Sequence, residues 1–151
     1  MQVSVVEYVV DAFLKVKPEE VSPENILAEG PNYYLAIEWK GVILKARKLC
    51  VVGFVGEIRV RGRFTDVLVK SGEPYVTVRI WEERSRILEQ TRVAEGAPVK
   101  VMGVLRVFRE NPYITPVILR KVDSRYLEYF HRRMVEERDS IASYVRKLSG
   151  E

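Results

Sequence analysis

The sequence predicts a mainly β protein, a small barrel of five strands with a long helix at its C-terminal end. The clearest observation is strict alternation of residue character over residues 99–108. Period-two alternation is typical of a strand with one buried face and one exposed face. A second observation is that Gly53 and Gly56 lie inside a long apolar run, because glycine within a strand permits the bend that curls a sheet into a barrel. In residues 99–108 the apolar face carries Val99, Val101, Leu105 and Val107, and the other face carries Lys100, Met102, Arg106 and Phe108.

Composition favours one intracellular globular domain. The chain has 151 residues, of which 47% are hydrophobic and 30% are charged. One cysteine, Cys50, and one histidine, His131, exclude an internal disulfide and a four-ligand zinc site. We expect no membrane span and no secretion, because no apolar run is long enough to cross a bilayer and no basic start precedes an apolar segment.

The positive charge is concentrated in the middle of the chain. The net charge of +4 divides into −4 for residues 1–40, +8 for residues 41–122 and 0 for residues 123–151. A basic excess on one module predicts a polyanionic partner. The alternative is that surplus lysine and arginine only keep the surface soluble.

The first 47 residues predict an extension that packs on the barrel. Ser4 and Glu7 have the spacing of a capping box, so we expect a short helix over residues 5–14. An edge strand is the alternative, because valine favours strands. Residues 17–31 contain three prolines and predict a loop or a partly extended connection. A hairpin follows, with strands at residues 33–38 and 42–46.

The next segment, residues 48–122, predicts the barrel itself. Three strands are followed by a short helix over residues 82–90 and then by two more strands. This order is that of the OB-fold, a five-stranded Greek-key barrel. The five strands are predicted at residues 49–60, 64–70, 75–81, 99–108 and 113–122.

The last segment, residues 123–151, predicts a helix that begins after Asp123 and Ser124. Its apolar stripe runs for nearly six turns, which is too long for a small barrel to cover. We therefore expect an oligomerisation helix that binds partner subunits, since a half-exposed stripe would favour aggregation. The alternative is a helix that closes the end of the barrel. The stripe consists of Leu127, Phe130, Met134, Ile141, Tyr144 and Leu148.

The exposed faces of the predicted strands carry rings and cations suited to single-stranded nucleic acid. Every base can stack on a ring, and lysine and arginine follow the phosphates. The alternatives are that Trp81 covers the barrel end or packs on the helix over residues 82–90, that Phe108 covers the barrel end, and that the arginines near Gly62 form a solvated hairpin. The candidate nucleic-acid-binding residues are Trp81, Phe108, Arg79, Lys100, Arg106, Arg59, Arg61, Arg63 and Tyr75.

Several of these stretches carry a family resemblance. Residues 99–108 resemble the fourth strand in the middle subunit of replication protein A, and Thr77–Trp81 is similar to that subunit's third strand. Val51-Val52-Gly53 resembles its first strand. Residues 31–34, Pro-Asn-Tyr-Tyr, are similar to the archaeal members and to the related subunit of the telomere-capping CST complex. The resemblance extends over residues 31–148.

The resemblance implies a barrel that binds single-stranded DNA modestly and a C-terminal helix that packs with helices of partner subunits. It places Trp81 and Phe108 at the positions of base-stacking rings, with Arg79, Lys100 and Arg106 beside them. Residues 70–74 depart from the family's usual turn between the second and third strands. We expect neither the family's phosphorylatable N-terminal tail nor its winged-helix domain, so recruitment roles are not carried over.

The sequence therefore predicts a non-enzymatic single-stranded DNA-binding subunit of a complex like replication protein A, acting in replication or repair without a cofactor. Its location would be the cytoplasm or nucleoid of an archaeon, or a eukaryotic nucleus. One alternative is a CST-like assembly subunit whose OB-fold mainly contacts proteins. Another is an RNA-binding OB module. Catalysis is not expected, because the sequence has no glycine-rich phosphate loop and His131 has no neighbouring nucleophile.

Overall fold

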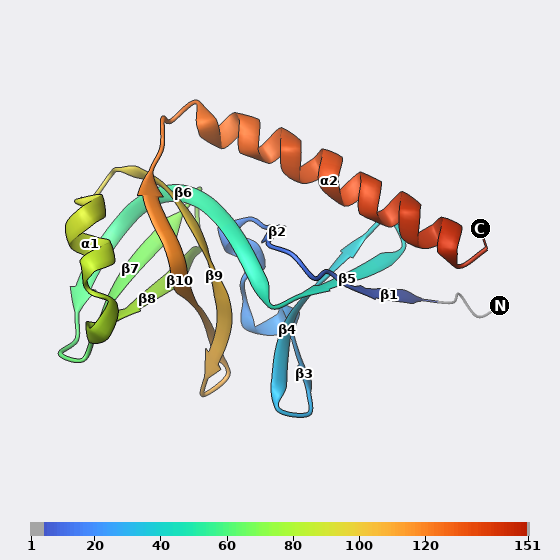
Figure 1. Ribbon diagram of the computed structural model, residues 1–151, viewed down its shortest axis with the longest axis horizontal. Helices are drawn as coiled ribbons and strands as arrows, with labels where there is room; N and C mark the ends of the chain where they lie inside the picture. Colours follow the sequence, from blue (N-terminus) through green and yellow to red (C-terminus); the bar gives the residue numbers. More distant parts are fainter. Residues whose placement is uncertain (1–4, 151) are drawn as a thin grey trace.

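The computed structural model describes residues 5–150, in which a closed barrel and a second, smaller sheet lie side by side under one long helix (Figure 1). The barrel confirms the predicted OB-fold. Its strands follow the order β6-β7-β8-β10-β9, and pairing of β6 with β9 closes it. The strands are β6 (Lys48–Val60), β7 (Phe64–Lys70), β8 (Tyr75–Trp81), β9 (Pro98–Phe108) and β10 (Asn111–Lys121).

The first barrel strand bends so that it can pair on both sides. The first half of β6 pairs with β9, and its second half pairs with β7, with a register shift within this second pairing between Val55 and Ile58. Gly53 lies at the crossing, where a Cβ atom would approach the carbonyl oxygen of Lys70 to 2.6 Å. Only glycine fits there without moving backbone, which explains why the bend follows this residue.

The smaller sheet is built from the N-terminal part of the chain, in the order β1-β5-β4-β3. The predicted hairpin is present as β4 (Asn32–Trp39) and β5 (Val42–Ala46). β3 (Ile26–Glu29) pairs with β4 inside the region that was predicted to be a loop or a partly extended connection, after two short 3-10 helices at Pro18–Glu20 and Pro23–Asn25. Residues 17–31 are therefore a partly extended connection, which is the second of the two forms predicted, and β3 is its extended part.

The predicted helix over residues 5–14 is also wrong. Val6–Val9 forms β1, which runs parallel to β5, and Leu14–Lys15 forms β2 beside β6. Val6 and Tyr8 pack toward the core while Val9 is exposed, so side chains alternate between the core and the surface as they do in a strand. The edge-strand alternative is correct, because valine-rich segments gain more from a pleated sheet than from a helix. Ser4 of the expected capping box lies outside the described residues.

The short helix between the third and fourth barrel strands is present, although it is divided in two. A 3-10 turn at Glu82–Arg84 precedes α1 (Arg86–Thr91). Ile87 and Leu88 of α1 pack against the core, and Thr91 Oγ1 donates a hydrogen bond of 2.7 Å to the carbonyl of Leu119. The helix therefore covers one end of the barrel.

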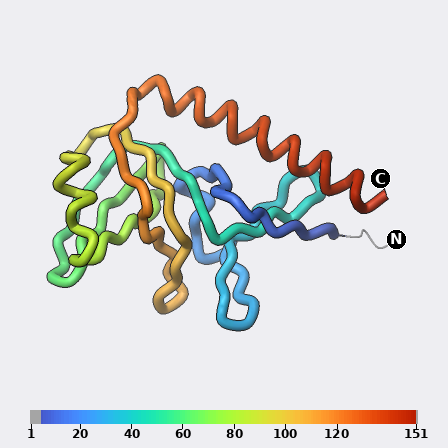
Figure 2. Tube along the Cα trace, in the orientation of Figure 1, coloured from blue at the N-terminus to red at the C-terminus, as the bar shows by residue number. Residues whose placement is uncertain are grey.

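The long helix α2 (Tyr126–Leu148) crosses from the barrel to the N-terminal sheet (Figures 1 and 2). Its first turns lie on the barrel, where Phe130 packs with Cys50 and Val52. Its last turns lie on the N-terminal sheet, where Ala142 and Val145 join the main core. As expected, the barrel alone does not cover the helix, but the second sheet extends the surface beneath it, so part of the apolar stripe is buried within this chain. That the helix binds partner subunits stays a prediction.

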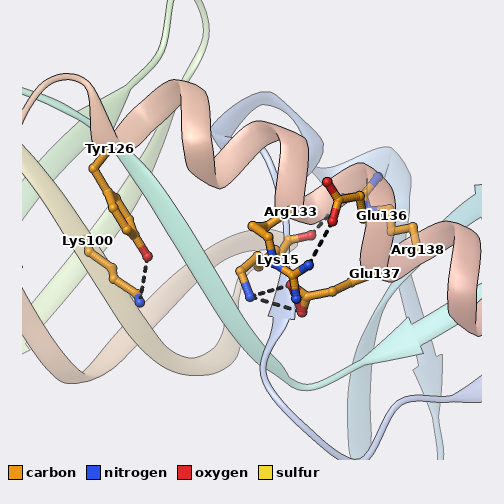
Figure 3. Close-up of polar contacts among 7 residues, drawn as sticks. All are labelled: Lys15, Lys100, Tyr126, Arg133, Glu136, Glu137 and Arg138. Carbon is orange, nitrogen blue, oxygen red and sulfur yellow. Dashed lines mark hydrogen bonds and ion pairs between the residues drawn. The ribbon is translucent and has the colours of Figure 1, made fainter.

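Polar contacts fix the middle of α2 to the segment that joins the two sheets. Arg138 is only 1% exposed, and its two terminal nitrogens donate to the carboxylate of Glu20 at 2.9 and 2.7 Å and to the carbonyl of Lys15 at 2.9 Å. Lys15 Nζ pairs with Glu137 at 2.7 Å (Figure 3). A third contact joins the helix to β4, because Trp39 Nε1 donates to Asp139 at 2.9 Å.

No helix in the described part of the chain combines the length and the apolar character needed to cross a lipid bilayer.

Candidate nucleic-acid interface

The outer face of β8 presents the side chains that the alternating pattern predicts. Val76, Val78 and Ile80 point into the barrel core. Between them Tyr75, Thr77, Arg79 and Trp81 point outward and are exposed or half-buried. Strand β7 extends this outer surface on one side, and β10 extends it on the other.

Arg79 lies at the centre of this surface between two aromatic rings. Its guanidinium carbon is 4.1 Å from the ring centroid of Phe64 and 4.6 Å from that of Tyr113. Asp66 accepts hydrogen bonds from its Nε at 3.0 Å and from its Nη2 at 3.3 Å. The carboxylate therefore neutralises Arg79 and holds its plane in place, so the arginine orders the rings rather than offering a free charge.

The rings continue along β7 and β8. Phe64 packs edge-on against Trp81, with ring centroids 5.2 Å apart and an interplanar angle of 62°. Trp81 is held by this contact and remains half-buried rather than enclosed. We call the surface formed by Phe64, Arg79, Trp81, Phe108 and Tyr113 the barrel face.

Phe108 reaches the barrel face from the hairpin between β9 and β10. The two turn residues, Arg109 and Glu110, both have positive φ (49° and 67°), which is typical of a tight type I′ turn. Phe108 is 57% exposed, and the guanidinium of Arg109 lies 5.2 Å from its ring centroid. Phe108, Arg79 and Tyr113 line a shared hollow of about 110 Å³.

The arginines of the first barrel turn differ in their availability. In the part of the chain that the structure describes, Arg59 pairs with Glu57 at 2.8 Å, whereas Arg61 and Arg63 are exposed without an ion pair. The hydrogen bond from Arg59 lowers the pKa of Glu57. Arg59 also shares an open hollow of about 330 Å³ with Tyr75. Arg61 and Arg63 are therefore the free cations at this edge of the barrel face.

Lys100 lies apart from the barrel face, although it is on the outer side of β9. Its Nζ donates to the hydroxyl of Tyr126 at 2.9 Å and lies 5.3 Å from the ring centroid, so the first turn of α2 holds it (Figure 3). Arg106, six residues further along the same strand, is exposed and pairs across the sheet with Tyr113. The two predicted nucleic-acid-binding cations of β9 are therefore in different places, with Arg106 beside the barrel face and Lys100 beneath the helix.

The predicted stripe of α2 is divided in the same way. Phe130 and Met134 are 3% and 1% exposed, so they are core residues of this chain rather than an open partner surface. Leu127 and Ile141 are partly buried against the two hydrophobic clusters. Tyr144 and Leu148 are 55% and 65% exposed. Only the C-terminal end of the predicted stripe is open to a partner.

Two rings of the barrel face, Phe64 and Tyr113, were not among the sequence candidates. A signal for Phe64 was present, because a turn at residues 71–74 pairs Lys70 with Tyr75 and so places Phe64 opposite Trp81. Tyr113 had no comparable signal. Its contact with Arg79 depends on the parallel pairing of β10 with β8, which joins strands far apart in the sequence.

The described residues do not group His, Cys, Asp and Glu side chains into a cluster that could hold a metal ion. Cys50 is buried beneath α2, and burial raises the pKa of its thiol, so it is a core side chain.

Comparisons with known proteins identify a relative. No family model matches the chain. The chain is 38% identical over 142 residues to an "Uncharacterized 18.7 kDa protein in ribosomal RNA operon" of Thermofilum pendens. The match covers 93% of this chain and 82% of that protein. The chain belongs to the family of this Thermofilum protein.

Two solved structures resemble this chain in more than the barrel, because the matched region covers most of the chain. The S. pombe Stn1–Ten1 complex contains a chain that matches with a TM-score of 0.64 and 12% identity, over 85% of this chain and 96% of that one. A replication protein A heterotrimer bound to single-stranded DNA contains another, with a TM-score of 0.64 and 19% identity, over 86% and 98%. The protein is thus an OB-fold protein with a long C-terminal helix that structurally resembles Stn1 and replication protein A subunits.

Proposed function

We propose that this protein is a non-catalytic single-stranded DNA-binding subunit of a complex like replication protein A. The observation that carries the proposal is the barrel face, where Arg79 orders Phe64 and Tyr113 beside Trp81 on the outer side of strands β7, β8 and β10. Rings held open on a strand surface can stack on bases of any sequence, and each such contact contributes about 1–3 kcal/mol.

The free cations lie where a strand bound to these rings would place its phosphates. Arg61 and Arg63 border the barrel face at the turn between β6 and β7. Arg106 and Arg109 border it at the hairpin between β9 and β10. OB-folds use loops at these two positions to hold oligonucleotides. The solved structure of a replication protein A heterotrimer bound to single-stranded DNA has a chain of the same fold, which supports DNA as the ligand.

A titration with labelled oligo-dT tests the proposal by fluorescence anisotropy. We expect Trp81→Ala to weaken binding about tenfold, because it removes one stacking ring. Trp39→Phe is the matched control, since Trp39 lies under α2 and donates to Asp139, away from the barrel face. No binding by the unaltered protein, or equal binding by Trp81→Ala, would contradict the proposal.

A second candidate function is that of an assembly subunit whose role is to hold partner proteins. The exposed apolar side chains of Tyr144 and Leu148 on α2 favour it, and the Stn1–Ten1 complex contains a chain of the same fold. This candidate predicts partner binding that survives Trp81→Ala together with weak binding of oligo-dT.

RNA is the alternative ligand for the barrel face. The Thermofilum relative is named for a ribosomal RNA operon, which favours a comparison of the two polymers. Stacking and phosphate contacts do not distinguish DNA from RNA, whereas a contact to the 2′-hydroxyl does. Competition between DNA and RNA oligomers of one sequence decides between them, since a tighter RNA complex would replace DNA in the proposal.

A further inference from the structure

A groove between the barrel and the N-terminal sheet carries three cations, of which Arg47 and Lys48 have no part in the barrel face and Arg106 borders both surfaces. It measures about 370 Å³ and lies between β9 of the barrel and β4 of the smaller sheet. The two hairpins to which β4 and β9 belong, β3–β4 and β9–β10, project to the same side of the molecule (Figure 1). Its lining includes Tyr34, Arg47, Lys48 and Arg106, with Asp11 as the one acidic side chain.

The cations of the groove are not neutralised by the protein. Within residues 5–150, Arg47, Lys48 and Arg106 form no ion pair, although many other surface cations do. Lys48 and Arg106 are exposed and Arg47 is partly exposed. Three unpaired cations facing one carboxylate produce a positive potential in a concave site, which favours a polyanion.

Backbone pairing fixes these cations beside one another. Lys48 lies opposite Val104 in the pairing of β6 with β9, and Leu105 donates a hydrogen bond of 2.7 Å to the carbonyl of Arg47. Arg106 therefore lies next to both residues while remaining on the outer side of β9. The spacing of the charges is set by the sheet and does not depend on a flexible loop.

The groove is continuous with the barrel face. Arg106 lines the groove and also pairs across the sheet with Tyr113, whose ring contacts Arg79. On the far wall, Tyr34 supplies a ring, which Lys45 Nζ approaches to 5.1 Å from the centroid. A strand leaving Tyr113 would thus meet Arg106 first, then Lys48 and Arg47, with Tyr34 opposite.

We propose that this groove is a second binding segment for single-stranded nucleic acid, which holds the phosphates of a strand that continues from the barrel face. The inference rests on the proposed function and extends it. It assigns the N-terminal sheet a part in binding and makes the complete site longer than the barrel alone.

The length of the oligonucleotide tests the inference. We would compare oligo-dT of about 6 and about 16 nucleotides, which span the site sizes of single OB-folds. The double variant R47A/K48A should bind the long oligomer about tenfold more weakly and the short one within about twofold. Its slope of log K against log salt should be shallower by about 1.4 for the long oligomer, because each contact to a single strand contributes about 0.7.

Two further measurements separate this site from general charge and from misfolding. Lys147→Glu removes an exposed cation at the far end of α2 and should leave both affinities unchanged. In the unaltered protein, the long oligomer should protect Lys48 from an amine-reactive reagent, and the short one should not. This second readout needs no substitution, so it stands even if R47A/K48A is unstable.

The outcomes are distinct. If the unaltered protein binds neither oligomer, the proposed function is wrong and the groove proposal falls with it. If both oligomers bind but R47A/K48A affects them equally or not at all, or if Lys48 is not protected, the groove is not a second segment and the proposed function stands.

Discussion

Arg79 is held between the rings of Phe64 and Tyr113 while Asp66 binds its guanidinium. An arginine bound in this way has no net charge to offer a phosphate, but its plane keeps both rings in position. Arg61 is the opposite kind of residue, because it is exposed and lacks an ion pair within the described chain. The two arginines should therefore contribute to nucleic-acid binding in different ways.

This difference gives a prediction for two single variants. Arg79→Lys keeps the charge opposite Asp66 but loses the planar contact with the rings, so affinity for oligo-dT should fall about fivefold with an unchanged salt dependence. Arg61→Ala should make the slope of log K against log salt shallower by about 0.7. Anisotropy titrations at several salt concentrations measure both effects. A shallower slope for Arg79→Lys would mean that Arg79 contacts phosphate.

At the scale of elements, the barrel strands could be predicted from the sequence closely. Residues 64–70 and 75–81 were predicted with the observed bounds, because alternating side chains and glycine-containing turns act locally. The strands β1 and β2 could not, since they form through parallel pairing with distant strands. Parallel neighbours leave no signal in the residues next to them, which also explains why Tyr113 was missed.

The buried side of α2 could not be read from its apolar residues alone. The buried residues follow the spacing Phe130, Met134, Arg138, Ala142 and Val145, with an arginine in the centre. A sequence pattern places arginine on the outside, because a buried charge needs a partner and Glu20 lies more than a hundred residues away. The predicted stripe therefore extended to Tyr144 and Leu148, which are exposed.

The contact between Glu20 and Arg138 should make the docking of α2 sensitive to acid. Burial acts to raise the pKa of Glu20, but hydrogen bonds from Arg138 and from the backbone N–H of Lys17 outweigh it, so the pKa lies below its ordinary value of 4.5. A carboxylate with a lowered pKa in the folded state contributes stability above that ordinary value. The contribution is lost as the pH falls through the folded-state pKa.

We therefore expect Glu20→Gln to lower the free energy of unfolding by about 2–3 kcal/mol at neutral pH, since it removes the charge that Arg138 binds. The loss of stability between about pH 5 and pH 3 should be smaller in this variant than in the unaltered protein. Urea unfolding at several pH values measures both quantities. Glu19→Gln is the matched control, because Glu19 is exposed beside it. An equal acid dependence in all three proteins would show that Glu20 does not link folding to pH.

At the scale of the whole molecule, α2 joins the two sheets, and the barrel face and the open end of the helix lie in different places. The barrel face belongs to β7–β10, whereas Tyr144 and Leu148 belong to the C-terminal end of α2, and this end of the helix lies over the N-terminal sheet (Figure 1). A partner could bind the helix end without covering the barrel face. Removing the helix is not a clean test of partner binding, because Phe130 and Met134 would then leave the core.

Substitution at the open end provides the cleaner test. The variant Y144E/L148E places two charges on an apolar contact surface and should reduce recovery of a partner in a native pull-down at least tenfold, because desolvating an unpaired charge at an interface is unfavourable. Its affinity for oligo-dT and its unfolding midpoint should not change, since both side chains are exposed. Lys147→Glu, between the two positions, is the control for added negative charge. Unchanged recovery with Y144E/L148E would exclude the end of α2 as the assembly surface, and a loss of oligo-dT binding would show that assembly and nucleic-acid binding share one surface.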